Sequence, residues 1–279
     1  MSNPSGKIAG VKSEHPQPER ARATHDAYAR YPSLRHRSVL ISGGATGIGA
    51  SIVEHFVRQD ARVAFIDIDG EAGTALANAL AAGSSHAPIF IRCDLRDIAA
   101  LQAAIADVRQ RLDGVRVLVN NAADDRRHAI DDVTSSAWDA GIAVNLRHAF
   151  FAAQAVKDDM RAAGGGSIIN LGSISWMIKQ GGMPVYTTAK AAIQGLTRSL
   201  ARDLGPHRIR VNTLVPGWVM TEKQLRLWVN AESARDIDRS QCLPDRLQPA
   251  DIARMALFLA ADDSASCTAQ DFVVDGGWS

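Results

Sequence analysis

The chain has 279 residues, of which 46% are hydrophobic, a length and composition that suit one large α/β domain better than two small ones. Its 31 basic and 30 acidic side chains give a formal net charge of +1, so no basic surplus is present to neutralise nucleic-acid phosphates. The three cysteines, Cys93, Cys242 and Cys267, are too few and too widely spaced for a disulfide framework or a metal site. The sequence has neither an apolar run of membrane-spanning length nor a signal-peptide core. We expect a soluble, cytoplasmic protein that binds a small molecule, without metal, nucleic acid or membrane.

The first residues, 1–37, differ in character from the rest of the chain. They mix proline, histidine, serine and charged side chains without helical or strand periodicity. This composition predicts a flexible N-terminal extension, in which residues 19–30 form at most one or two helical turns. We assign no catalytic role to the extension.

From Ser38 onward, the sequence pattern predicts alternating strands and helices. The predicted strands are 38–42, 62–66, 88–92, 115–119, 167–171, 208–213 and 271–274. Several of them are near-continuous apolar runs, as in sheets that are covered on both faces. Amphipathic stretches such as Gly47 to Gln59 and Asp97 to Leu112 separate them. The alternation predicts a single-domain, Rossmann-type, doubly wound parallel sheet over residues 38–279, with about seven strands and helices on both faces.

A glycine-rich turn follows the first predicted strand. The stretch Gly43-Gly44-Ala45-Thr46-Gly47-Ile48-Gly49 comes directly after the strand and opens a helix. Glycines there permit a tight turn and the close approach of a pyrophosphate, and the helix N-terminus favours an anion. A glycine turn without a ligand is the alternative. The predicted dinucleotide-binding residues of this turn are Gly43, Thr46, Gly47, Ile48 and Gly49.

The second predicted strand ends at Asp67. A carboxylate at this place accepts hydrogen bonds from the adenosine ribose and repels a 2′-phosphate, which favours NAD over NADP. Two alternatives remain open. Asp67 could cap the next helix, or Arg62 or Arg92 could serve a phosphate.

Tyr186 and Lys190 are one helical turn apart, so their side chains share a helix face. A nearby ammonium lowers the pKa of a phenol from its ordinary value of about 10 toward the working pH, which makes a general acid/base. On its own such a pair is also typical of a solvated helix face. Ser173 stands at the end of the preceding strand and Asn145 comes before it, which strengthens the catalytic interpretation.

These residues, the glycine turn and Asn120-Asn121-Ala122-Ala123 together resemble the short-chain dehydrogenase/reductase family, from the first strand to the end of the chain. The resemblance implies that Tyr186, helped by Lys190, takes the proton of a substrate hydroxyl while a hydride moves to the nicotinamide. It also implies that Ser173 hydrogen-bonds the substrate oxygen, with Ser175 as the competitor for this role. Lys190 matches the family's ligand of the nicotinamide ribose, and Asn145 its anchor for a proton relay.

The same resemblance adds cofactor contacts. Asp94 and Leu95 match the adenine-contacting pair, and Asn121 lies at the end of the fourth strand. In the loop Pro216-Gly217-Trp218-Val219-Met220-Thr221, the implied nicotinamide and pyrophosphate contacts are Gly217, Val219 and Thr221. Two positions depart from the family pattern. Ser42 replaces the usual threonine but keeps a hydroxyl, and Ala123 replaces a glycine, so its methyl group narrows the floor of the cofactor groove.

Within the family, the stretches 120–128, 172–176, 145–148 and 241–243 resemble the branch of bacterial NAD-dependent aldose 1-dehydrogenases that includes D-xylose dehydrogenase. A sugar needs polar partners for its hydroxyls and an apolar platform for a ring face. The alternative is that the tryptophans are core residues and the Asp/Arg run is a solvated loop. The charged segment 222–244, which carries Trp228, predicts a lid. The predicted substrate-binding residues are Asp124, Ser173, Trp176, Gln180, Tyr186 and Trp218.

The reaction that this resemblance implies is oxidation of the C1 hydroxyl of an aldopyranose, of the D-xylose or L-arabinose type, by NAD to a lactone. The alternatives are a reductase or dehydrogenase for another polar alcohol or ketone, such as a deoxy sugar acid, and a dinucleotide-binding regulator without turnover. The intact Ser173, Tyr186 and Lys190 count against a regulator. The C-terminal residues 271–278 resemble the family's last strand and tail, so we expect a homo-oligomer, a tetramer, whose interfaces do not involve the extension.

Overall fold

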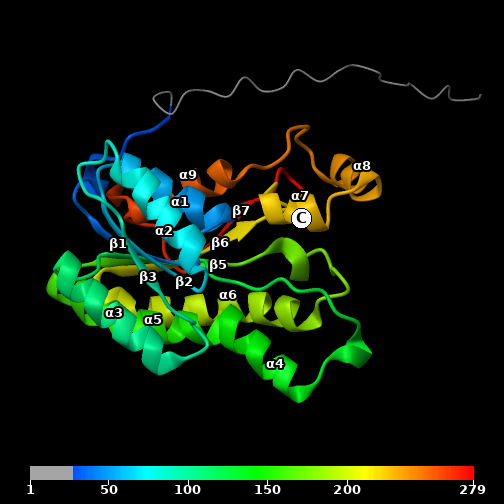
Figure 1. Ribbon diagram of the computed structural model, residues 1–279, viewed down its shortest axis with the longest axis horizontal. Coiled ribbons are helices and arrows are strands. Elements are labelled where there is room, and N and C mark those ends of the chain that lie inside the picture. Colours follow the sequence, from blue (N-terminus) through cyan, green and yellow to red (C-terminus); the bar gives the residue numbers. More distant parts are fainter. Residues whose placement is uncertain (1–27) are drawn as a thin grey trace, which may run out of the picture.

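The computed structural model describes residues 28–279. Within them, one parallel sheet has the strand order β3-β2-β1-β4-β5-β6-β7 and runs through the middle of the molecule (Figure 1). The predicted doubly wound sheet is confirmed, and its strand order switches between β1 and β4, the place where such sheets bind ligands. The strands are β1 (Ser38–Ser42), β2 (Arg62–Asp67), β3 (Ile89–Arg92), β4 (Val117–Asn120), β5 (Gly166–Leu171), β6 (Ile209–Pro216) and β7 (Asp271–Val274).

Helices cover both faces of the sheet (Figure 1). The helices α1 (Gly47–Arg58), α2 (Gly70–Ala81) and α9 (Pro249–Ala260) pack on one face. The helices α3 (Ile98–Leu112), α5 (His148–Ala162) and α6 (Pro184–Leu204) pack on the other. Three further helices are α4 (Ser135–Ile142), α7 (Glu222–Leu227) and α8 (Ala231–Ser240), of which α7 and α8 follow the carboxyl end of β6.

The central strand β1 shows why the strands read as continuous apolar runs. Val39 and Ile41 belong to the cluster on the side of α1 and α9, while Leu40 belongs to the cluster on the side of α3 and α5. All three are almost completely buried. Because helices cover both faces, neither set of alternating positions needs to be polar.

The packed structure begins before Ser38. A short 3₁₀ turn, η2 (Pro32–Leu34), places Leu34 fully inside the core cluster beside α1. The Asp262 backbone N–H donates to the Ser33 hydroxyl at 3.0 Å, and Arg37 pairs with the Asp262 carboxylate at 3.1 Å. The predicted extension therefore does not reach as far as residue 37. The helical turn predicted at 19–30 falls largely outside the described residues.

Strand β6 extends furthest beyond its predicted bounds. The strand predicted at 208–213 continues to Pro216, because β6 keeps pairing with β7 from Thr213↔Asp271 to Pro216↔Val274. This extension carries the following loop to the carboxyl edge of the sheet, where Gly217 donates its N–H to the Val274 carbonyl at 2.9 Å.

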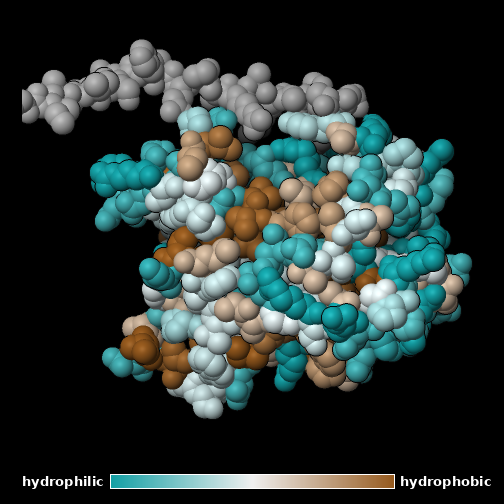
Figure 2. Space-filling view, turned by 180° about the vertical axis from the view of Figure 1, so that it is seen from behind, coloured by the Kyte–Doolittle hydropathy of each residue, from teal (hydrophilic) through white to brown (hydrophobic). Residues whose placement is uncertain are grey.

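Seen from behind, apolar residues form separate patches between hydrophilic ones (Figure 2). The exposed large apolar side chains include Trp138 on α4, Phe150 on α5 and Val273 on the edge strand β7. Of the helices that the structure describes, none combines the length and the apolar character that a bilayer span requires.

Candidate active site

Two adjoining cavities open at the carboxyl edge of the sheet. The larger, of about 1170 Å³, is lined by the glycine turn after β1, the end of β2 and the loop after β3. The smaller, of about 360 Å³, lies between the loop after β5, α6 and the loop after β6. Five residues line both, so the two cavities meet: Ile48, Asn121, Ala123, Tyr186 and Thr221.

The glycine turn leaves backbone groups free at the start of α1. Gly43 and Gly47 have φ values of +66° and +56°, which favour glycine. A Cβ on Gly43 would meet the Ala122 Cα at 2.6 Å, and one on Gly49 would meet the Gly43 carbonyl oxygen at 1.8 Å. The N-cap Thr46 makes no side-chain capping bond, so the first-turn N–H groups are available to an anion. The turn therefore fits the pyrophosphate of a dinucleotide.

Asn121 holds the glycine turn to the end of β4. Its Nδ2 donates to the carbonyls of Ser42 and Gly43 at 3.2 and 2.7 Å, and its backbone N–H donates to the Ser42 hydroxyl at 3.1 Å. Ser42 thus keeps the hydroxyl function that a threonine would supply. These bonds fix the floor of the larger cavity.

Two carboxylates line the larger cavity at the places that the sequence predicted. Asp67 ends β2 and accepts hydrogen bonds from the backbone N–H groups of Ala45 and Asp69 at 2.9 and 3.0 Å. Asp94 forms an ion pair with Arg96 at 2.6 Å, and hydrogen bonds from Arg96 lower the pKa of this carboxyl. Leu95, which lies between Asp94 and Arg96 in the sequence, is buried and lines the same cavity.

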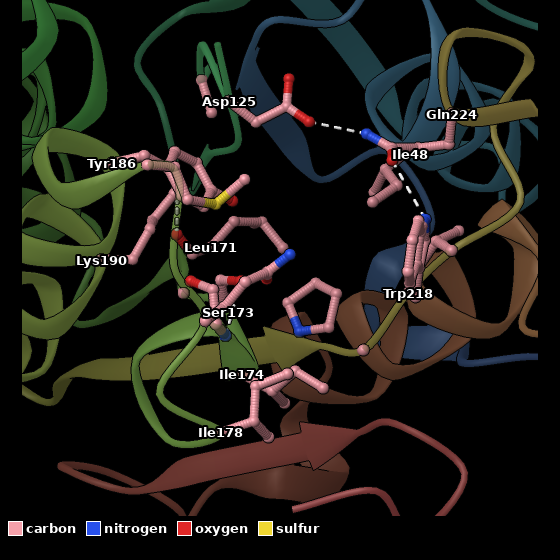
Figure 3. A pocket seen from close by; sticks show the side chains of 18 of the residues that line it. Ile48, Asp125, Leu171, Ser173, Ile174, Ile178, Tyr186, Lys190, Trp218 and Gln224 are labelled. Atoms are coloured by element: carbon pink, nitrogen blue, oxygen red, sulfur yellow. Dashed lines mark hydrogen bonds between the residues drawn. The ribbon is translucent and has the colours of Figure 1, made fainter. Parts of the chain in front are cut away.

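Ser173, Tyr186 and Lys190 lie on the same side of the smaller cavity (Figure 3), and Tyr186 also lines the larger one. Ser173 follows β5, and its Oγ accepts a bond from the Ser175 N–H at 3.1 Å. Lys190 is buried, and its Nζ lies 5.6 Å from the centre of the Tyr186 ring. Ser173 lies close enough to Tyr186 to lower the pKa of its phenol, whereas the Ser175 hydroxyl is buried without a partner among the described residues. Ser173 is therefore better placed than Ser175 for the serine role.

The pKa of Tyr186 differs from the prediction made for it. Burial raises this pKa to about 12, and Asp125 adds to the increase, while the neighbouring Ser173 side chain acts against it. Burial lowers the pKa of Lys190 to about 8. Lys190 does not offset this increase; its Nζ donates to the Leu171 carbonyl at 2.7 Å and lies over the Tyr186 ring.

Asn145 lies in a π-helical segment, η4 (Ala143–Arg147), between α4 and α5. Its Oδ1 accepts from the Asp124 N–H at 2.9 Å, and its Nδ2 donates to the carbonyls of Asp124 and Gly141 at 3.1 and 2.9 Å. These bonds position the loop after β4 beside Tyr186.

His148, the first residue after η4, was not singled out from the sequence, because one histidine in a helical run does not reveal its neighbours. Its side chain is buried. Burial, and after it the charge of Lys190, lowers the pKa of His148 to about 3.

The smaller cavity has an apolar side and a polar side. Gln180 and Trp218 line it, as predicted, but Asp124 and Trp176 do not. Asp124 lines the larger cavity instead, and Asp125 occupies the wall of the smaller one. Sequence reasoning missed several lining residues that come from three separate parts of the chain: Asp125, Arg127, Gln224, Asp236 and Trp278.

The predicted lid segment forms α7 and α8 beside the smaller cavity. Thr221 begins α7 by accepting a bond from the Gln224 N–H at 3.2 Å. The Arg127 guanidinium lies over the rings of Trp228 and Trp218, at 4.3 and 5.8 Å from their centres. The loop after β4 therefore contacts the segment predicted as a lid, and residues of both line the smaller cavity.

Comparisons with known proteins agree with this geometry. The family model described as "Enoyl-(Acyl carrier protein) reductase" matches residues 43–279. The probable galactose dehydrogenase GalD of Rhizobium meliloti (strain 1021) is 49% identical over 249 residues, which cover 89% of this chain and 97% of that protein. D-xylose 1-dehydrogenase of Caulobacter vibrioides (strain NA1000 / CB15N) is 46% identical over 250 residues, 90% of this chain and 98% of that protein.

A solved structure points the same way. The blue fluorescent protein from a metagenomic library, in complex with NADPH, superposes with a TM-score of 0.82 at 32% identity, covering 88% of this chain and 99% of that one. Because the family match spans most of the sheet and both cavities, the chain belongs to the short-chain dehydrogenase/reductase family of oxidoreductases, which act on CH–OH groups with a nicotinamide dinucleotide.

Proposed function

We propose that the protein oxidises the C1 hydroxyl of an aldopyranose, of the D-xylose or L-arabinose type, to the lactone with NAD. The observation that carries the proposal is the small cavity beside Ser173 and Tyr186, which combines an apolar side with hydrogen-bonding groups. Its volume of about 360 Å³ suits a small ligand. The two relatives named above are called probable galactose dehydrogenase and D-xylose 1-dehydrogenase, which supports a sugar as the substrate.

The chain's own residues divide the work of the reaction. Bound NAD would supply a hydride acceptor at its nicotinamide. Ser173 holds the substrate oxygen by a hydrogen bond, and Tyr186 takes the proton from that oxygen. Lys190, buried one helical turn from Tyr186, would hold the ribose of the nicotinamide. The ring oxygen of the sugar stabilises positive charge that develops at C1, so an anomeric hydroxyl is a good hydride source.

The apolar side of the cavity suits the carbon face of a sugar ring. Trp218 and Trp278 lie with ring centres 6.3 Å apart, and both line the cavity. Aromatic rings provide a flat apolar surface on which the face of a pyranose packs. Gln180 and Asp125 line the same cavity with hydrogen-bonding groups, which serve the ring hydroxyls.

The cofactor preference rests on Asp67. Its carboxylate is held at the end of β2 by two backbone N–H groups, in the position where it would accept bonds from ribose hydroxyls and repel a 2′-phosphate. We expect kcat/KM to be higher with NAD than with NADP, and we expect Asp67→Ala to shrink the difference. Steady-state kinetics with both cofactors measures this. Equal use of NAD and NADP by the unchanged protein would contradict the assignment.

A substrate screen tests the proposed reaction. We expect the absorbance of reduced cofactor to rise with aldopyranoses such as D-xylose or L-arabinose, with a marked stereochemical preference. Product analysis by NMR should show a lactone that hydrolyses to the aldonic acid. A ketose product, or activity confined to open-chain polyols, would refute oxidation at C1 and leave the dehydrogenase assignment intact.

One observation favours a second candidate, a deoxy sugar acid as substrate. Arg127 lines the small cavity, and its Nε is buried without a partner among the described residues. A guanidinium with a free donor suits a carboxylate. The same screen therefore includes sugar acids, and faster turnover of an acid than of any neutral aldose would select this candidate.

We also propose a cytoplasmic homotetramer. All three cysteines are free, as expected in a reducing compartment. The edge strand β7 carries the exposed Val273, and an open strand edge with apolar side chains favours pairing with a second copy.

A further inference from the structure

Asp125 joins the loop after β4 to the lid across the small cavity (Figure 3). Its Oδ1 accepts a hydrogen bond from Nζ of Lys223 at 2.5 Å, and its Oδ2 accepts one from Nε2 of Gln224 at 2.6 Å. Gln224 in turn accepts a bond from Nε1 of Trp218 at 3.0 Å. The carboxylate therefore has a fixed position, which residues of α7 and of the loop after β6 define.

The carboxylate of Asp125 is charged and largely shielded from solvent. Its side chain is 21% exposed. Burial acts to raise the pKa of this carboxyl, but the hydrogen bonds from Lys223 and Gln224 outweigh burial and hold the pKa below its ordinary value. Asp125 is therefore ionised at neutral pH, on the wall of the cavity that Ser173 and Tyr186 also line.

We propose that Asp125 is the residue that determines substrate specificity at this site, and that its carboxylate accepts a hydrogen bond from a ring hydroxyl of the aldose. The inference rests on the proposed function, since Ser173 and Tyr186 would hold the C1 oxygen while Asp125 lies apart from them on the cavity wall (Figure 3). A ring that spans the cavity then presents a remote hydroxyl to the carboxylate.

The hydrogen-bonding capacity of Asp125 allows this role. An ionised carboxylate accepts about four hydrogen bonds. Lys223 and Gln224 provide two donors, which leaves room for a substrate hydroxyl. When the substrate lacks that hydroxyl, the remaining acceptor site of the carboxylate gains no bond, so the protein stabilises the transition state of the analogue less than that of the complete sugar.

The experiment compares a sugar with analogues that each lack one ring hydroxyl. For the wild-type protein we expect kcat/KM to favour the complete aldose over one of these analogues by a factor on the order of 10 to 100. In Asp125→Ala this ratio should fall toward one, because kcat/KM should fall for the complete sugar and stay unchanged for that analogue. Asp125→Asn, which keeps the shape and one acceptor oxygen, should give an intermediate ratio, and thermal melting confirms that both variants fold.

Two control variants separate hydroxyl recognition from a role in holding the lid. Lys223→Met removes one tie to α7 and leaves the carboxylate, so it should change kcat/KM for the sugar and the analogue by the same factor. Asp238→Asn removes a charge from α8 that pairs with Arg246 at 2.7 Å outside the cavity, and it should leave the ratio unchanged.

A binding measurement provides a readout without turnover. In a Tyr186→Phe background, calorimetry should show that Asp125→Ala weakens binding of the complete sugar and leaves binding of the analogue unchanged. If the wild-type protein oxidises aldoses but Asp125→Ala lowers kcat/KM for the complete sugar and for the analogue by the same factor, Asp125 only holds the lid and the inference is overturned. If the wild-type protein oxidises no aldose at all, the proposed function itself fails, and the inference fails with it.

Discussion

Replacing Tyr186 by phenylalanine is expected to lower kcat by a factor on the order of 10² to 10⁴, the contribution of a positioned general acid/base. The change removes one hydroxyl and keeps the ring that packs beside Lys190, so affinity for the dinucleotide should hardly change. Steady-state kinetics gives the rate, and fluorescence titration with the reduced dinucleotide gives the affinity.

The pH dependence gives a second test of the same residue. Burial raises the pKa of Tyr186 to about 12 in the protein without ligands, and only the phenolate can take a proton. The rate of oxidation by the wild-type protein should therefore rise with pH, and the residual rate of Tyr186→Phe should lack this rise. Tyr31→Phe serves as the control, because Tyr31 packs against the core cluster on the α1 side and lines neither cavity. Retention of most activity by Tyr186→Phe would disprove the assigned role.

Replacing Gly49 by alanine is expected to damage both stability and dinucleotide binding. The new Cβ would lie 1.8 Å from the Gly43 carbonyl oxygen and 2.6 Å from Nδ2 of Asn121. The Gly43 carbonyl belongs to the backbone, and the Asn121 amide is held by hydrogen bonds. Neither can move away at low energetic cost, so the turn must shift. We expect the free energy of unfolding to fall by about 1–3 kcal/mol. We also expect dinucleotide affinity to fall, because the shifted N–H groups no longer converge on the pyrophosphate. Urea denaturation and fluorescence titration measure the two effects.

Gly195→Ala is the matched control for this variant. Gly195 lies inside α6, and a Cβ there would have nothing within 4 Å. Alanine in place of glycine within a helix stabilises by roughly 0.5–1 kcal/mol, so Gly195→Ala should unfold at a higher urea concentration and bind the dinucleotide normally. A Gly49→Ala protein as stable as the wild type would show that the turn adapts, contrary to the contacts described above.

The fold could be predicted because its signals are local. Each central strand is a short apolar run bounded by turn residues, and the glycine turn directly precedes a helix, so strand, turn and helix are all visible in a window of about 20 residues. The end of β6 was less predictable. Val215 and Pro216 remain in the sheet because β7 pairs with them, and this partner is far away in the sequence.

The grouping of the proposed catalytic and cofactor residues around the two cavities was predictable for a related reason, since these residues follow strands in a fixed order. The substrate cavity was not. Asp124 and Asp125 are adjacent and chemically equivalent, and a loop has no periodicity to show which of them faces the cavity. The bonds that decide it come from Asn145, which holds the Asp124 backbone, and from Lys223 and Gln224, which hold the Asp125 side chain.

The wrong direction predicted for the Tyr186 pKa has a comparable origin. Spacing alone places Lys190 near the phenol but gives neither the depth of burial nor the competing carbonyl of Leu171. Burial acts on the two groups in opposite senses, raising one pKa and lowering the other. The protonation states of Tyr186 and Lys190 therefore depend on how deeply the surrounding residues bury them.

The π-helical segment η4 makes this region unusually sensitive to insertions and deletions. A π turn contains an extra residue compared with an α-helical turn, and each residue of an α-helix rotates the chain by about 100°. Loss of a single residue between Ala143 and Arg147 would turn all of α4 relative to α5 and carry Asn145 away from the Asp124 backbone. A one-residue gap here in a related sequence therefore signals a rebuilt active site, although every catalytic side chain is still present.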